Sequence, residues 1–172
     1  MKLSSEVLLD SERIARRVRE IARQIAADTP DGGALTVIAL MHGALMFCAD
    51  LVRQLDMPLH LALVPVVSVD RGGRPGEIPL PADLPLRDAD VLLVDDILDT
   101  GRTLHALRAR LHQQSADRVR IAVLLDKPAR RSADVVADYV GFAVPNRWMV
   151  GYGLDWRGLY RNLPHVTWIE DD

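Results

Sequence analysis

Three aspartates in the middle of the chain, Asp95, Asp96 and Asp99, have the residue type and spacing to hold a metal ion or the hydroxyls of a sugar. They follow an apolar run at residues 91–94, which indicates a strand buried on both faces of a parallel sheet. The carboxylates would then lie at the carboxyl end of that strand, where open α/β sheets bind ligands. The sequence therefore predicts an acidic ligand site at this edge of the sheet.

A short loop after the acids suits a phosphate group. It runs through Asp99, Thr100, Gly101, Arg102 and Thr103, and leucines at helical spacing follow it. The free N–H groups and the positive dipole end of a helix favour an anion. Gly101 allows the close backbone approach that a side chain would obstruct. A phosphate cradle is thus predicted beside the acidic site.

The elements that position these residues read as strands alternating with helices. We expect Ser11 to cap an amphipathic helix whose apolar stripe includes Ile14, Val18, Ile21 and Ile25. A second helix runs from the loop at residues 41–44 to about Leu55. The expected strands are residues 35–40, 59–67, 91–94, 119–125, 139–144, 148–150 and 166–169. This alternation predicts an α/β fold with a mainly parallel sheet.

Length and composition limit the other possibilities. A chain of 172 residues suits a single domain, residues 1–172, and its net charge of −3 argues against a general nucleic-acid binder. The single cysteine, Cys48, fits a reducing compartment, and neither a signal peptide nor a membrane-spanning segment is expected. We therefore expect a cytoplasmic protein. Glycines and prolines break up residues 68–88, which predicts a long functional or mobile loop.

The acidic pair followed by Asp-Thr-Gly-x-Thr resembles the phosphoribosyl-pyrophosphate signature of the type I phosphoribosyltransferases. Four more segments resemble the hypoxanthine-guanine branch in order and spacing: residues 124–128 (Leu-Leu-Asp-Lys-Pro), 140–142, 150–155 and 160–163. The resemblance implies the type I phosphoribosyltransferase fold. In that fold helices flank the central sheet, the N- and C-terminal parts form a small hood, and a flexible active-site loop corresponds to about residues 68–88.

The activity implied by the resemblance is purine salvage. A phosphoribosyl group passes from phosphoribosyl pyrophosphate to N9 of hypoxanthine or guanine, which gives IMP or GMP plus pyrophosphate. Mg²⁺ is the implied cofactor, and relatives suggest a homodimer or homotetramer. The residues leave open the preference among hypoxanthine, guanine and xanthine.

The resemblance also implies roles for the acids and the loop. Asp95 and Asp96 would face the ribose hydroxyls and Mg²⁺, and Asp99 would act as the general base beside the purine. The loop that begins with Asp99 would hold the 5′-phosphate through the backbone of Thr100, Gly101 and Arg102 and the hydroxyl of Thr103. Asp155 would hold a second Mg²⁺.

Further residues would hold the base and the pyrophosphate. Lys127 would donate to O6 of the purine, Trp148 and Ile97 would stack on its two faces, and Met149 would contact its pyrimidine edge through the backbone. The pyrophosphate would be bound by His42, Gly43 and Arg161.

Two departures from the family pattern keep a second function open. His42 stands where many relatives carry lysine, in a loop that often has a non-proline cis peptide before this residue. Val69 stands where relatives carry a loop tyrosine. The alternative is a catalytically weak or inactive regulator that binds purine nucleotides on the same fold. The presence of four residues argues against it: Asp99, Lys127, Asp155 and Arg161.

Two other classes of protein fit poorly. A phosphoacceptor receiver domain has its acidic pair after the first strand, whereas here the pair lies in the middle of the chain. A dinucleotide-binding oxidoreductase needs a third glycine after Gly151 and Gly153, but Trp156 occupies that position.

Overall fold

The computed structural model describes residues 2–30, 33–66 and 78–170. The strands are β1 (Lys2–Leu3), β2 (Leu35–Met41), β3 (Leu59–Pro65), β4 (Asp90–Leu98), β5 (Arg118–Asp126), β6 (Tyr139–Ala143), β7 (Trp148–Val150) and β8 (Thr167–Glu170). The helices are α1 (Ser11–Asp28), α2 (Leu45–Val52) and α3 (Arg102–Gln113), with a 3₁₀ turn at Pro128–Arg130. Among the described residues, no helix is long and apolar enough to cross a membrane.

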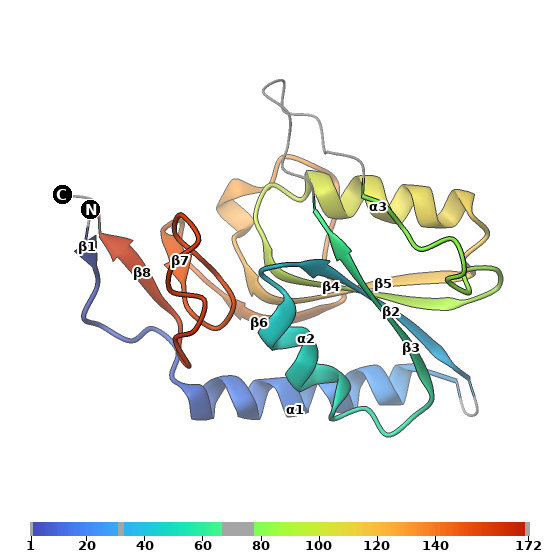
Figure 1. The fold of residues 1–172 in the computed structure, drawn as a ribbon, viewed down its shortest axis with the longest axis horizontal. Helices are drawn as coiled ribbons and strands as arrows, with labels where there is room; N and C mark the ends of the chain where they lie inside the picture. The colour runs from blue at the N-terminus through green and yellow to red at the C-terminus, as the bar shows by residue number, and fades with distance from the viewer. Residues whose placement is uncertain (1, 31–32, 67–77, 171–172) are drawn as a thin grey trace.

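Five parallel strands form the central sheet, in the order β3-β2-β4-β5-β6. Strand β4 lies in the middle, so its apolar residues 91–94 are fully buried, as their sequence predicts. Figure 1 shows α3 on one face of the sheet and α1 and α2 on the other. The predicted α/β fold is confirmed.

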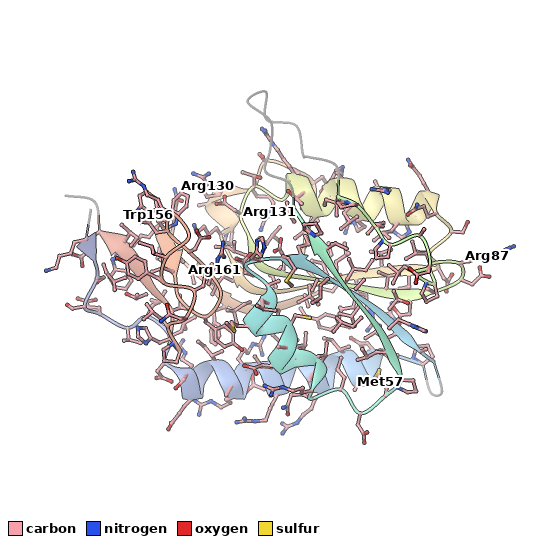
Figure 2. All side chains as sticks on the ribbon, viewed as in Figure 1. Met57, Arg87, Arg130, Arg131, Trp156 and Arg161 are labelled. Atoms are coloured by element: carbon pink, nitrogen blue, oxygen red, sulfur yellow. The ribbon has the colours of Figure 1, made fainter. Side chains whose placement is uncertain are left out.

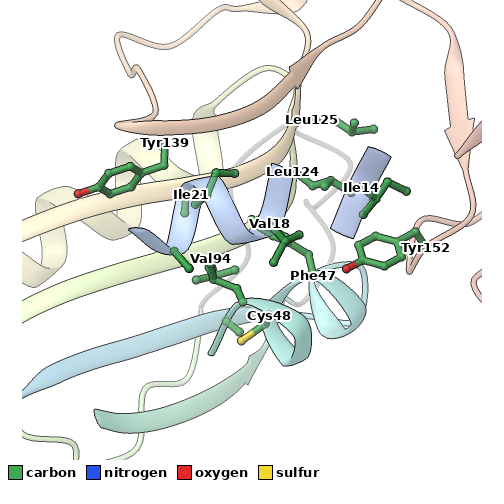
Figure 3. Close-up of a cluster of buried hydrophobic side chains, with 14 of the residues drawn as sticks. Ile14, Val18, Ile21, Phe47, Cys48, Val94, Leu124, Leu125, Tyr139 and Tyr152 are labelled. Carbon is green, nitrogen blue, oxygen red and sulfur yellow. The ribbon is translucent and has the colours of Figure 1, made fainter. Parts of the chain in front are cut away.

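Successive residues of β4 serve two separate cores because side chains alternate across a strand. Leu92 and Val94 pack with α1 and α2, whereas Val91 and Leu93 pack with the leucines of α3. Figure 3 shows the first of these cores, in which Ile14 and Phe47 approach the sheet from the two helices. Burial on both faces fixes the position of β4, and with it the acids at its end.

The hood is a second sheet of three antiparallel strands in the order β1-β8-β7. It brings the N-terminal strand β1 next to β8, so both chain ends contribute to it, as the resemblance implied (Figure 1). Strand β1 itself was not predicted, since two residues are too few for a periodic pattern.

Several local predictions need correction. Asp10, not Ser11, caps α1: its carboxylate accepts a hydrogen bond of 2.7 Å from the backbone N–H of Arg13. The strand expected at residues 59–67 forms β3 at the edge of the sheet, where Leu61 and Leu63 are about half exposed.

Other boundaries also differ from the predictions. Strand β4 continues to Leu98, so Asp95 and Asp96 lie within the strand and not after it. The second helix ends at Val52, and the strand predicted at 59–67 ends at Pro65. Of the predicted loop at 68–88, residues 68–77, including Val69, lie outside the described residues, and residues 78–88 contain no helix or strand.

A buried arginine on β5, Arg120, connects α1 to the sheet. The guanidinium of Arg120, 3% exposed, lies 2.6 Å from the carboxylate of Asp90 on the neighbouring strand. It also donates to the hydroxyl of Tyr139 at 2.8 Å and to that of Thr29, after the end of α1, at 2.8 Å. The Tyr139 hydroxyl in turn donates to Asp28 at 2.8 Å. Arg120 of β5 therefore satisfies polar groups of β4, of β6 and of the residue that ends α1.

We expect Arg120→Met to destabilise the protein by about 3–5 kcal/mol, because it leaves the Asp90 carboxylate buried without its partner. Thermal unfolding monitored by circular dichroism measures the effect, a drop in Tm of roughly 10 °C for a chain of this size. Arg118→Met is the matched control on the same strand, since Arg118 is exposed and donates only to a backbone carbonyl. Equal Tm values for the two variants would contradict the prediction.

Candidate active site

Two neighbouring strands bring Asp99 and Lys127 together. In the register of β4 with β5, Leu98 lies opposite Asp126, and the backbone N–H of Lys127 donates to the carbonyl of Leu98 at 3.0 Å. The residues that follow the two strands are therefore adjacent. The Lys127 Nζ lies 3.9 Å from Asp99 Oδ2, and burial lowers the pKa of Lys127.

The acidic pair at the end of β4 is partly buried. Desolvation raises the pKa of Asp95, and the neighbouring charge of Asp96 adds to this effect. Desolvation also raises the pKa of Asp96, although the positive charge of Arg161 opposes the shift. Two carboxylates that repel one another in a partly dry site are suited to a divalent cation.

No group of three or more metal-ligating side chains occurs among residues 2–30, 33–66 and 78–170. This arrangement still fits Mg²⁺, because Mg²⁺ usually takes one or two carboxylates and completes its shell with water and substrate phosphates. The donor chemistry of Asp95 and Asp96 therefore matches the predicted metal.

The predicted phosphate loop lines a small hollow of about 80 Å³ at the start of α3. Its wall contains Asp95, Ile97, Leu98, Asp99, Thr100, Gly101, Arg102, Thr103 and Leu104. Gly101 has φ = +80°, and a Cβ at this position would lie 2.4 Å from the side chain of Val135. Glycine is thus required both by the left-handed turn and by the space behind it.

A second hollow, of about 170 Å³, adjoins the first at Ile97 and Asp99. It brings together all four residues predicted to contact the purine, along with three acids and a leucine. The full set is Asp96, Ile97, Asp99, Lys127, Trp148, Met149, Leu154 and Asp155. The indole of Trp148 and the aliphatic side chains suit the faces of a flat heterocycle, and the buried ammonium group of Lys127 suits a hydrogen-bond acceptor on it.

A wider, open hollow continues beyond Trp148. All three tryptophans of the chain, Trp148, Trp156 and Trp168, line it. Trp148 is 55% exposed, yet its ring is held in place because its indole N–H donates to the carbonyl of Asp155 at 2.7 Å. Trp156 packs edge-on against Trp148, with a ring-centroid distance of 4.8 Å. The exposed face of Trp148 is thus a fixed stacking surface.

The loop between β2 and α2 approaches the acidic pair from another direction. A Cβ on Gly43 would lie 1.8 Å from Asp96 Oδ2, so only glycine fits beside this carboxylate. The peptide bond between Met41 and His42 is cis, as the resemblance implied. His42 itself is exposed and lines none of the three hollows.

Arg161 and Asp155 form an ion pair at the same end of the sheet, with 2.7 Å between Arg161 Nη2 and Asp155 Oδ1. Asp155 also accepts a hydrogen bond of 2.6 Å from the backbone N–H of Gly158. In Figure 2, Trp156 lies at the hood, whereas Arg161 lies between the hood and the central sheet. Arg161 does not line the described hollows, but its charge reaches Asp96.

Arg130 is a site residue that the sequence analysis missed. Its Nε donates to Asp99 Oδ1 at 2.8 Å, so two cations, Arg130 and Lys127, flank the carboxylate of Asp99. The neighbouring Arg131 donates to the backbone carbonyl of Leu98 at 3.1 Å and braces the same loop. The sequence does show both arginines within four residues after Lys127. It does not show whether their side chains turn toward Asp99 or toward solvent.

Comparisons with known proteins agree on one family. The sequence model of the phosphoribosyl transferase domain matches residues 4–157. The hypoxanthine-guanine phosphoribosyltransferase of Aquifex aeolicus is 40% identical over 169 residues, which cover 96% of this chain and 95% of that protein. The corresponding protein of Staphylococcus aureus is 39% identical over 97% of this chain and 94% of its own length.

Solved structures give the same result. A hypoxanthine-guanine phosphoribosyltransferase from Bacillus anthracis superposes with a TM-score of 0.89 at 33% identity and covers 96% of this chain and 97% of its own. A hypoxanthine phosphoribosyltransferase from Trypanosoma cruzi gives a TM-score of 0.90 at 31% identity, with 99% of this chain and 97% of that chain covered.

Proposed function

This chain belongs to the phosphoribosyl transferase domain family, and from that premise we propose that it is a hypoxanthine-guanine phosphoribosyltransferase of purine salvage. It transfers the phosphoribosyl group of phosphoribosyl pyrophosphate to N9 of hypoxanthine or guanine and releases pyrophosphate. The C1–O bond to pyrophosphate breaks, the C1–N9 bond forms, and the purine loses a ring proton.

The observation that carries this proposal is the adjacency of two hollows at the end of β4. One is the cradle formed by the loop at residues 99–103, and the other is a hollow that combines apolar side chains and three acids with a buried ammonium group, that of Lys127. Asp99 lines both. A nucleotide product has a phosphate, a sugar and a base in this order, and the two hollows suit its two ends.

We assign the chemistry within the purine hollow as follows. Trp148 and Ile97 hold the two faces of the base, and Met149 contacts its pyrimidine edge. Lys127 donates to O6, which adenine cannot accept because it carries an amino group there. Asp99 takes the ring proton as N9 bonds to the sugar, the role of a general base.

The remaining groups act on the donor. Thr100, Gly101, Arg102 and Thr103 bind the 5′-phosphate through backbone N–H groups, the Thr103 hydroxyl and the positive end of α3. The pyrophosphate lies against the His42–Gly43 backbone and Arg161. Much of this binding uses backbone groups, which is why histidine at position 42 is compatible with it.

Asp95 and Asp96 would hold one Mg²⁺ indirectly, through the ribose hydroxyls and water. Asp155 would hold a second Mg²⁺. When bound, Mg²⁺ neutralises negative charge on the departing pyrophosphate. Asp155 already pairs with Arg161, so the two residues order one another on the pyrophosphate side.

A steady-state assay with phosphoribosyl pyrophosphate and MgCl₂ tests the proposed function. Hypoxanthine, guanine, xanthine and adenine are supplied in turn, and nucleotide formation is followed by absorbance. We expect IMP from hypoxanthine and GMP from guanine, turnover of adenine reduced at least about 100-fold, and no turnover with EDTA in place of MgCl₂. Absence of product from every base, with IMP still bound in calorimetry, would favour the regulatory alternative.

We further propose that residues 1–172 act as one catalytic domain that assembles as a homodimer or homotetramer in the cytoplasm. Support for assembly comes from exposed apolar side chains on the edge strand β3 and the start of α2: Leu61, Leu63, Leu45 and Met46. Light scattering coupled to size exclusion measures the mass directly. The buried free thiol of Cys48 is compatible with a reducing compartment.

A further inference from the structure

Tyr152 joins the C-terminal part of the chain to α2 without touching any of the three hollows. Its hydroxyl donates a hydrogen bond of 2.6 Å to Asp50 Oδ2, and its side chain is buried. Burial raises the pKa of Tyr152, so the hydroxyl keeps its proton and remains the donor. Asp50 lies on α2, the helix that begins directly after the loop containing Gly43. This bond therefore connects two segments about 100 residues apart in sequence.

The backbone around Tyr152 is an unusual turn. Gly151, Tyr152 and Gly153 all have positive φ, of 95°, 49° and 98°. A left-handed conformation is unfavourable for a tyrosine, so the surrounding contacts must hold it. The N–H of Tyr152 donates to the carbonyl of Leu163 at 2.8 Å, and that of Gly153 donates to the carbonyl of Arg161 at 3.0 Å. The turn is thus bound to the segment that carries Arg161.

Gly153 lies between the two groups assigned to the pyrophosphate. On one side, a Cβ at Gly153 would lie 2.2 Å from the carbonyl oxygen of Gly43, so the two backbones are in direct contact. On the other side, Arg161 Nη1 donates to the carbonyl oxygen of Gly153 at 2.6 Å. Any shift of the turn would therefore change the spacing between the Gly43 loop and the Arg161 guanidinium.

We propose that Tyr152 is a positioning residue for the pyrophosphate end of the donor: its bond to Asp50 fixes the turn against α2, and thereby fixes Arg161 relative to the Gly43 loop. The proposal rests on the proposed function for the identity of the ligand. The Tyr152 hydroxyl does not contact the ligand, and it does not act on the purine hollow. Its effect must appear in the binding of phosphoribosyl pyrophosphate and not in that of the base.

The test is Tyr152→Phe, which removes only the hydroxyl and keeps the ring. We expect the KM for phosphoribosyl pyrophosphate to rise about three- to tenfold, the range for one lost hydrogen bond that orders a binding group. The KM for hypoxanthine should stay within about twofold of wild type, a range too small to reflect a lost contact. Calorimetry of phosphoribosyl pyrophosphate with MgCl₂ should show the same weakening.

Four further variants separate positioning from general stability. Tyr139→Phe removes another buried tyrosine hydroxyl, on β6, and Arg53→Gln removes the second side-chain contact of Asp50 together with a hydrogen bond to the carbonyl of Ala49. Neither should change the KM for the donor. Asp50→Asn keeps an acceptor oxygen and should behave as wild type, whereas Asp50→Ala should reproduce Tyr152→Phe.

The outcomes are distinct. A Tyr152→Phe enzyme whose two KM values are unchanged, or rise together, would overturn the positioning role while leaving the proposed function intact. If the wild-type protein turns over no base, the proposed function fails. Calorimetry with phosphoribosyl pyrophosphate and MgCl₂ then decides: weaker binding by Tyr152→Phe supports the inference, and equal binding or no binding by either protein overturns it.

Discussion

Asp99→Asn should lower kcat for hypoxanthine by about 10²- to 10⁴-fold, the usual contribution of a general base. Asparagine has the shape of aspartate, but its amide cannot accept the purine ring proton. Asp99 lines both the phosphate and the purine hollows and lies between two cations, Lys127 and Arg130. Its carboxylate is therefore at the point where base and sugar must meet.

Steady-state kinetics with both substrates saturating measures this effect, and calorimetry of IMP binding separates lost chemistry from lost binding. Asp134→Asn is the matched control, because this acid is exposed and lies outside the three hollows. If Asp99→Asn retained more than about a tenth of the wild-type kcat, proton transfer would have to be assigned to another group.

Lys127→Met should raise the KM for hypoxanthine about 10- to 150-fold, which corresponds to the loss of one hydrogen bond from a charged donor, about 1.5–3 kcal/mol. Methionine fills a similar volume, so the buried site is not left with a cavity. Lys127 is only 7% exposed, and among the described residues its ammonium group has one ion-pair partner within 4 Å, Asp99. The remaining hydrogen-bonding capacity is suited to the purine oxygen.

Initial rates at varied hypoxanthine and saturating phosphoribosyl pyrophosphate give this KM, and the KM for the donor should change less than about twofold. The chain provides a simple control, since its only other lysine, Lys2, lies exposed in the hood. Lys2→Met should have no effect. An unchanged KM for hypoxanthine in Lys127→Met would place the oxygen of the base elsewhere in the hollow.

The sequence was sufficient to predict the parts of the site that are local. The acids of β4, the loop from Asp99 to Thr103 and the helix after it are consecutive, so alternation and capping preferences place them together. Lys127 was predicted from the resemblance of residues 124–128 to the family pattern, and the parallel register of β4 and β5 explains why it lies beside Asp99. The roles of these residues stay predictions that the variants above test.

Contacts between distant segments could not be predicted in this way. The approach of Gly43 to Asp96, the contact of Gly153 with Gly43 and the Asp99–Arg130 pair depend on loop conformations that no periodicity encodes. The exposure of Leu61 and Leu63 on β3 was not predicted, for a related reason. An apolar run does not reveal whether its strand lies in the middle of a sheet or at its edge.

The gathering of Trp148, Trp156 and Trp168 around one hollow has an optical consequence. Since the chain contains no other tryptophan, its tryptophan fluorescence, excited selectively at wavelengths that tyrosine does not absorb, originates at this one hollow. The emission is then a local signal and not an average over the fold. If a base stacks on Trp148 as proposed, it would quench one member of this cluster directly, and occupancy of the hollow would be visible in the natural protein without any attached dye.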